Sequence, residues 1–154
     1  MNKALMFSSK SDEWATPQEF FDALNAEFDF DVDLAASAEN AKVSDFYSLQ
    51  HSALDAEWSV QHDIGWCNPP YSRGLQAKFI AKAAEDRLNG FTTVMLIPAR
   101  TDTKAFHAYI WDAEKHRPRP GVEVRFVKGR LKFGGCKDAA PFPSMVVIFR
   151  PEVV

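Results

Sequence analysis

The feature that most constrains this chain is a pair of consecutive prolines, Pro69 and Pro70, which follow the short apolar run Ile64 to Cys67. Proline lacks a backbone N–H and fixes φ, so neither a strand ladder nor a helix continues through two of them. The run therefore predicts a buried strand, and the prolines predict a stiff, extended loop at its carboxyl end. In open α/β sheets, ligands bind at the carboxyl ends of the strands.

The residues beside the prolines offer chemically distinct groups to a ligand. Asn68 carries an amide, Tyr71 an aromatic ring and Ser72 a hydroxyl. A proline-rich turn between a strand and a helix is the structural alternative. Residues 68–71 resemble the N-P-P-Y motif of amino-group methyltransferases, which use S-adenosylmethionine to methylate planar nitrogens, and we favour this functional interpretation.

The rest of the chain alternates between helix and strand patterns. A continuous apolar run at residues 92–97 predicts a central strand covered on both faces. Helical periodicity or strand alternation marks the other segments: helices over 17–28, 73–89 and 103–113, and strands over 30–36, 122–127 and 144–149. A short edge strand is expected over 45–47, with Phe46 in the core. These patterns predict one α/β domain spanning residues 1–154, with residues 1–13 as a flexible lead-in.

Two segments upstream of the prolines carry local signals. Thr16 with Glu19 three residues later forms a capping-box pattern, and Pro17 stands at the first helical position. Asp33 lies near the end of the first predicted strand and is followed by small residues, including Ala35, which would let a nucleoside-type ligand approach. An aspartate at a strand end is also common in turns.

Several stretches resemble the phage-type DNA N-6-adenine methyltransferase family, in the family's order. They are W-x-T-P at 14–17, D-L-A-A-S-A-E-N-A at 33–41, L-D-A-E-W at 54–58, N-P-P-Y-S at 68–72, L-x-P-A-R-x-D-T at 96–103 and G-R-L-K-F at 129–133. The resemblance implies a Rossmann-like, S-adenosylmethionine-dependent methyltransferase fold. In this fold the sheet is mostly parallel and ends in an antiparallel pair of C-terminal strands. The glycine-rich loop common among methyltransferases is absent after Asp33, a departure from the wider superfamily that matches this narrower family.

The resemblance also implies residue roles. Asn68, Pro69, Pro70 and Tyr71 are expected to be catalytic. The cofactor S-adenosylmethionine is expected to contact Trp14, Thr16, Pro17, Asp33, Ala35 and Asn68, with Asp45 or Asp55 binding the ribose hydroxyls. The substrate is expected to contact Tyr71, Ser72, Arg73, Arg100 and Arg130, although Arg100 could instead pair with Asp102. No metal is expected in the reaction.

Charge is distributed unevenly along the chain, whose net charge is −3. Residues 1–72 contain three Lys or Arg and 13 Asp or Glu, whereas residues 73–154 contain 15 and eight. The basic half suggests contact with phosphates, and DNA with a flipped adenine is the partner that the resemblance implies. A small target-recognition element is expected within 100–121 or 134–143.

Other classes of function are less well supported. No apolar run reaches the ~20 residues that cross a bilayer, and the start of the chain lacks a secretory signal. The two cysteines, Cys67 and Cys136, fit a reducing cytoplasm, which would be the host's for a phage protein. A monomer is favoured. The alternatives are methylation of an RNA base or a protein glutamine, and an inactive nucleic-acid-binding module.

Overall fold

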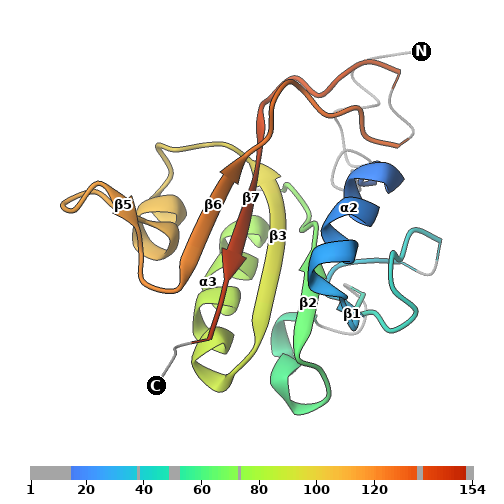
Figure 1. Ribbon diagram of the computed structural model, residues 1–154, viewed down its shortest axis with the longest axis horizontal. Coiled ribbons are helices and arrows are strands. Elements are labelled where there is room, and N and C mark those ends of the chain that lie inside the picture. The colour runs from blue at the N-terminus through green and yellow to red at the C-terminus, as the bar shows by residue number, and fades with distance from the viewer. Residues whose placement is uncertain (1–14, 38, 49–52, 73, 135–136, 152–154) are drawn as a thin grey trace.

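The computed structural model describes residues 15–37, 39–48, 53–72, 74–134 and 137–151. A five-stranded sheet in the order β1-β2-β3-β7-β6 forms its centre (Figure 1). The strands are β1 (Val32–Asp33), β2 (Ile64–Cys67), β3 (Thr92–Pro98), β6 (Val122–Phe126) and β7 (Ser144–Phe149). Only β7 runs against the others, pairing antiparallel with β3 and β6. The expected α/β fold, with a mostly parallel sheet and an antiparallel C-terminal pair, is therefore confirmed.

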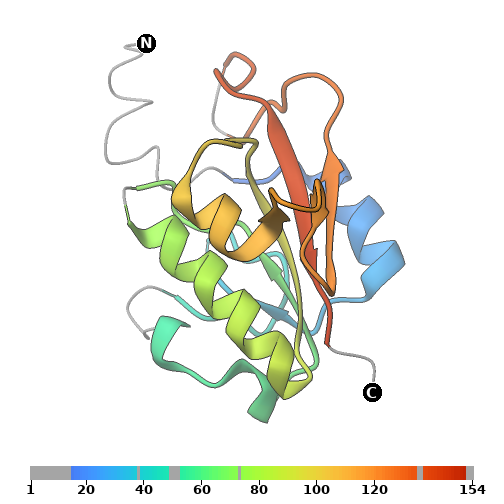
Figure 2. The same ribbon diagram turned by 90° about the vertical axis from the view of Figure 1, so that its left-hand side faces the viewer.

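Helices cover both faces of this sheet, as Figures 1 and 2 show. Helix α2 (Gln18–Phe28) lies on one face and α3 (Leu75–Asp86) on the other. Side chains of β3 alternate between the two layers: Val94 and Leu96 pack with α2, whereas Met95 and Ile97 pack with α3. This double coverage explains why the run at residues 92–97 is apolar without alternation.

The α3 side of the core also contains the short helical turns. These are η3 (Ala53–Asp55), η4 (Trp58–Val60) and η6 (Phe106–Ile110). Trp58 is fully buried there and donates its indole N–H to the Ala53 carbonyl. The helix predicted over 103–113 is shortened to η6, because a small hairpin of β4 (Trp111–Asp112) and β5 (Arg117–Pro118) follows it.

Two further expectations are corrected at element ends. A 3₁₀ turn, η5 (Arg87–Asn89), changes the helical phase after α3, so Leu88 is exposed and Arg87 is buried instead. Gly90 then ends the segment with φ 88°, as expected of a left-handed C-terminal glycine. The edge strand expected at 45–47 is a single parallel bridge between Phe46 and Asp33, and Phe46 is exposed rather than in the core.

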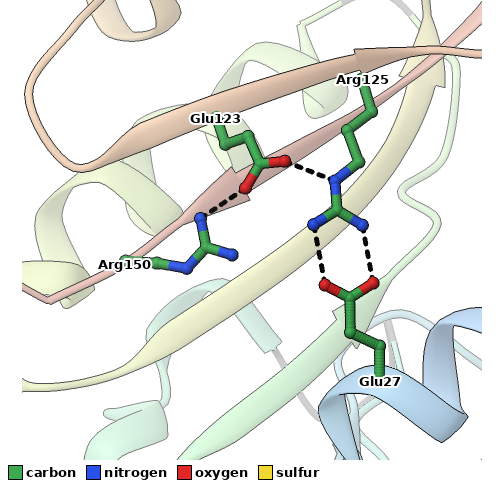
Figure 3. A network of polar contacts seen from close by, with 4 residues as sticks. All are labelled: Glu27, Glu123, Arg125 and Arg150. Carbon is green, nitrogen blue, oxygen red and sulfur yellow. Dashed lines mark hydrogen bonds and ion pairs between the residues drawn. The ribbon is translucent and has the colours of Figure 1, made fainter.

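A polar network joins the C-terminal end of α2 to β6, the edge strand of the sheet (Figure 3). Arg125 of β6 makes two bonds to the Glu27 carboxylate, at 2.7 and 2.8 Å, and a third to Glu123. Arg150 donates to the other Glu123 oxygen. Both guanidinium groups also lie over the Phe28 ring. These groups are partly exposed, so the network orients α2 more than it stabilises the fold.

Among the described residues, no helix combines the length and the apolar character needed to cross a membrane.

Candidate active site

The carboxyl ends of three parallel strands meet at one edge of the sheet. Asp33 ends β1, Asn68 follows β2, and Arg100 follows β3 by two residues. Register pairs Asp33 with Trp66 and Cys67 with Met95, so the three chain ends lie side by side. The segment between β6 and β7 returns to this edge, where the Ala99 N–H donates to the Pro143 carbonyl at 2.8 Å.

The Asn68 amide is held at both of its ends. Its Nδ2 donates to Thr16 Oγ1 at 3.0 Å, and its Oδ1 accepts from the Tyr71 hydroxyl at 3.1 Å. Pro69 and Pro70 behind it are buried. The loop predicted to be stiff is thus fixed both by its prolines and by side-chain bonds to residues 52 positions upstream and three positions downstream.

Tyr71 is packed by aromatic rings from the β6–β7 segment. Phe133 and Phe142 lie edge-on to it, with ring centroids 6.3 and 5.5 Å away. Burial raises the pKa of the Tyr71 hydroxyl well above its usual value. The hydroxyl therefore stays protonated at physiological pH and donates its hydrogen to Asn68.

The capping box expected at Thr16 is wrong. Helix α2 begins at Gln18 with Pro17 as its N-cap, and no side chain caps it. Thr16 is 4% exposed, and its hydroxyl accepts from Asn68 instead. A strand-like bridge to Gly134 through Ala15 keeps Thr16 at the sheet edge and out of the helical turn that a capping residue occupies.

Asp33 organises the loop that follows β1. One carboxylate oxygen accepts from the Ala35 N–H at 3.2 Å and the other from the Lys42 N–H at 3.0 Å. Burial raises the pKa of this carboxyl from 3.8 to about 6, although both backbone bonds favour the charged form. The carboxylate thus fixes backbone at the sheet edge, where Ala35 leaves space beside it.

This raised pKa predicts how Asp33→Asn changes stability with pH. Because native Asp33 binds its proton more tightly than the unfolded chain does, its contribution is most favourable below pH 4 and is lost as the pH rises through 6. The asparagine side chain of the variant does not titrate. The stability of the variant relative to wild type should therefore rise by about 2 kcal/mol between pH 4 and 7, as measured by urea unfolding at several pH values.

Asp112→Asn provides a control of opposite sign. Backbone bonds from Lys115 and Glu114 lower the pKa of Asp112, so its contribution is present at neutral pH and is lost in acid. The stability of Asp112→Asn relative to wild type should therefore fall as pH rises. A stability difference between Asp33→Asn and wild type that does not change with pH would contradict the raised pKa of the buried Asp33 carboxyl.

The expected substrate contacts lie around the same edge. Ser72 Oγ is buried and has no hydrogen-bond partner among the described residues, so it suits a polar group of a ligand. Arg100 and Arg130 are exposed, and Arg130 also reaches the Ala140 carbonyl at 3.4 Å. Trp14 and Arg73 lie outside the described residues.

The two candidate ribose acids occupy different surroundings. The Asp45 carbonyl accepts from the Asp33 N–H at 2.9 Å, which places this residue beside β1. Its exposed side chain borders a hollow of about 300 Å³ together with His62 and Tyr47. Asp55 is exposed in the turn η3. Neither acid is buried with the Asn68 network.

Two contacts of this site were not predicted from the sequence. Phe133 stands within the G-R-L-K-F stretch and Phe142 between two prolines, but their packing on Tyr71 joins segments about 60 to 70 residues apart. The bond between Thr16 and Asn68 was hidden by the stronger local signal of a helix cap. No group of three or more His, Cys, Asp or Glu able to hold a metal ion occurs in the described ranges.

Comparisons with known proteins identify a family and similar sequences. A family model described as DNA N-6-adenine-methyltransferase (Dam) matches residues 3–153. A DNA N-6-adenine-methyltransferase of Haemophilus phage HP1 is 30% identical over 155 residues, covering 99% of this chain and 86% of the phage protein. One of Escherichia phage T1 is 36% identical over 96 residues, covering 62% of this chain and 39% of that protein.

Proposed function

Since this chain belongs to the DNA N-6-adenine-methyltransferase (Dam) family, we propose that it methylates the N6 amine of adenine in DNA with S-adenosylmethionine as the methyl donor. The observation that carries this proposal is the Asn68 amide, fixed by Thr16 and Tyr71 at the carboxyl end of β2. The sheet order supports a Rossmann-like methyltransferase fold, since the parallel strands end together at this edge.

The chemistry requires positioning more than acid or base catalysis. The adenine amine is a poor nucleophile, because its lone pair is conjugated with the ring. Asn68 Oδ1 and the Pro69 carbonyl can each accept one N6 hydrogen, since a carbonyl oxygen has two acceptor sites. Together they draw the nitrogen toward tetrahedral geometry and direct its lone pair. The buried Pro69 and Pro70 keep that carbonyl from moving.

We propose that the cofactor binds beside Asp33, at the same edge of the sheet as Asn68. S-adenosylmethionine, when bound, supplies an electrophilic methyl group on a sulfonium. Asp33 holds the backbone at Ala35 and Lys42, and the small Ala35 side chain is partly exposed beside it. Trp14 and Pro17 are the proposed contacts at the methionine end, together with the backbone and methyl group of Thr16, because the Thr16 hydroxyl is bonded to Asn68. Asp45 is proposed for the ribose in place of Asp55, because its backbone is bonded to β1.

A base inside the double helix cannot reach Asn68, so we propose that adenine is flipped out to the site. Tyr71 would stack on the flipped base, in an orientation set by Phe133 and Phe142. Such stacking contributes about 1–3 kcal/mol per base. The Ser72 hydroxyl, which has no hydrogen-bond partner in the described part of the chain, would bond to a polar group of the nucleotide.

Expression in a methylation-deficient host tests the reaction directly. Single-molecule sequencing of the host DNA should reveal N6-methyladenine at a defined sequence context when the chain is expressed, and none with an empty vector. Transfer of labelled methyl groups to purified RNA or protein, with none to DNA, would instead select the RNA-base or glutamine alternative. An absence of transfer together with an absence of cofactor binding would leave an inactive binding module.

DNA should be bound through the basic residues at the strand ends. Exposed cations follow β3 and fill the β6–β7 segment, namely Arg100, Lys104, Lys128, Arg130, Lys132 and Lys137. Replacing both Arg100 and Arg130 by Gln should weaken DNA binding and reduce the slope of log affinity against log salt by about 2, because two phosphate contacts are lost. Fluorescence anisotropy at several salt concentrations measures this slope.

Lys78→Gln is the matched control, because Lys78 is exposed on α3 and lies outside both segments expected to recognise DNA. If the salt slope of the control fell by as much per removed charge as that of the double variant, net charge and not the strand-end surface would determine the affinity for DNA.

A further inference from the structure

Thr16 stands out because its side chain is buried without serving the helix beside it. The hydroxyl is 52 residues away from Asn68 in the chain, yet it accepts the Asn68 Nδ2 hydrogen at 3.0 Å. Threonine before a helix normally bonds to the backbone of the first turn. Here α2 begins without any side-chain cap, so the hydroxyl has been diverted from helix formation to the predicted catalytic amide.

This bond holds the plane of the Asn68 amide, with the Nδ2 end toward Thr16. An asparagine amide has an acceptor end and a donor end of nearly the same shape. The protonated Tyr71 hydroxyl donates to Oδ1, and Thr16 receives the Nδ2 end. Both hydroxyls can rotate to donate or to accept, so a reversed amide would still find partners, but its Oδ1 would be turned toward Thr16 and away from the adenine amine.

The position of Thr16 is itself fixed on both sides. Its preceding residue, Ala15, accepts a backbone bond from Gly134 at 2.8 Å, and the Pro17 carbonyl accepts from the Phe21 N–H at 3.1 Å. Pro17 has a fixed φ, and Phe21 is buried against Trp66 of β2. Thr16 is thus anchored to the sheet that carries Asn68, as a rigid support for the amide requires.

We propose that Thr16 is a positioning residue for methyl transfer: it holds the Asn68 amide with Oδ1 toward the substrate amine. This inference rests on the proposed function of Asn68. It differs from the cofactor contact expected of Thr16, because it assigns the hydroxyl to the orientation of another side chain. Loss of the hydroxyl should therefore slow the methyl-transfer step and leave the affinity for the cofactor nearly unchanged.

Thr16→Val tests the proposal, because valine keeps the shape of threonine and removes the acceptor. We expect kcat for DNA methylation to fall roughly 10- to 100-fold, the scale of a misplaced reacting group, with KM for S-adenosylmethionine within about twofold. Thr16→Ser restores the hydroxyl and should recover most of this loss. Thr92→Val, at the amino end of β3, controls for replacement of a threonine elsewhere in the fold.

A structural measurement makes the test independent of turnover. In ¹⁵N-labelled protein, the Asn68 side-chain amide signal is identified by its absence in Asn68→Ala. It should move in Thr16→Val and stay near its wild-type position in Thr16→Ser and Thr92→Val. An unmoved signal in Thr16→Val would overturn the proposal even if the wild-type protein methylated no DNA.

The activity outcomes separate the remaining explanations. If wild type methylates DNA and Thr16→Val has the same kcat, the positioning role is overturned while the proposed function stands. If Thr16→Val raises KM for the cofactor at unchanged kcat, Thr16 is a cofactor contact and the inference is wrong. If wild type methylates RNA or protein instead, the proposed function fails, and the kcat of Thr16→Val on that substrate still decides the positioning role.

Discussion

Asn68→Ala is expected to abolish detectable methylation of DNA adenine, a loss on the order of 1000-fold, while S-adenosylmethionine still binds. The substitution removes the Oδ1 acceptor that would orient the amine, and the loss of one well-placed polar group at a reacting centre costs about 100- to 1000-fold. It also removes the two hydrogen bonds that Asn68 makes, one to Thr16 and one to Tyr71. Initial rates on DNA and calorimetry with the cofactor measure the two effects separately.

Asn68→Asp is the matched variant, because a carboxylate keeps two acceptor oxygens and removes only the amide donor. It should retain more activity than Asn68→Ala, since the Thr16 hydroxyl can donate to a carboxylate oxygen. A circular dichroism melt controls for loss of fold in both variants. Wild-type turnover in a folded Asn68→Ala protein would remove Asn68 from the mechanism.

Trp66→Ala is expected to destabilise the fold by about 3–5 kcal/mol, the usual cost of deleting a large buried aromatic side chain. Trp66 is 1% exposed and packs against Phe21 and Phe30, with ring centroids 5.4 and 5.7 Å away. It lies two residues before Asn68 and supports the helix that follows Thr16. Urea unfolding followed by circular dichroism should show this loss as a transition at a lower urea concentration, because α2 detaches from the sheet more easily.

Trp66→Phe should lose much less stability than Trp66→Ala, because a phenyl ring fills part of the same space. Trp111→Ala is a second control, since Trp111 is only partly buried and belongs to the small β4–β5 hairpin. Comparable losses in Trp66→Ala and Trp111→Ala would mean that the α2 layer contributes less to stability than its burial indicates.

Much of the sheet could be predicted because its signals are local. The apolar run at 92–97 predicted β3, and the proline pair predicted the end of β2 and the loop after it. The charge asymmetry predicted contact with phosphates, which stays a prediction, and exposed cations do follow β3 and lie between β6 and β7.

Contacts between distant segments could not be predicted in this way. Thr16, Pro17 and Glu19 form a good capping pattern, and the pattern failed because a partner 52 residues away took the hydroxyl. Leu88 kept the helical spacing of its neighbours, but a 3₁₀ turn exposed it. Phe133 and Phe142 needed the β6–β7 segment to fold back over Tyr71. In each case tertiary packing outweighed a local preference.

The place of β7 in the sheet has a consequence for how the chain folds during synthesis. Residues 144–149 form the strand between β3 and β6, and all six are buried. Until the ribosome has released them, β3 lacks a neighbour along one edge and β6 has nothing to pair with. The pairing of β3 with β7 joins residues about 50 positions apart, and such long-range contacts slow folding. A nascent chain that stops before residue 144 should therefore remain unfolded and depend on chaperones.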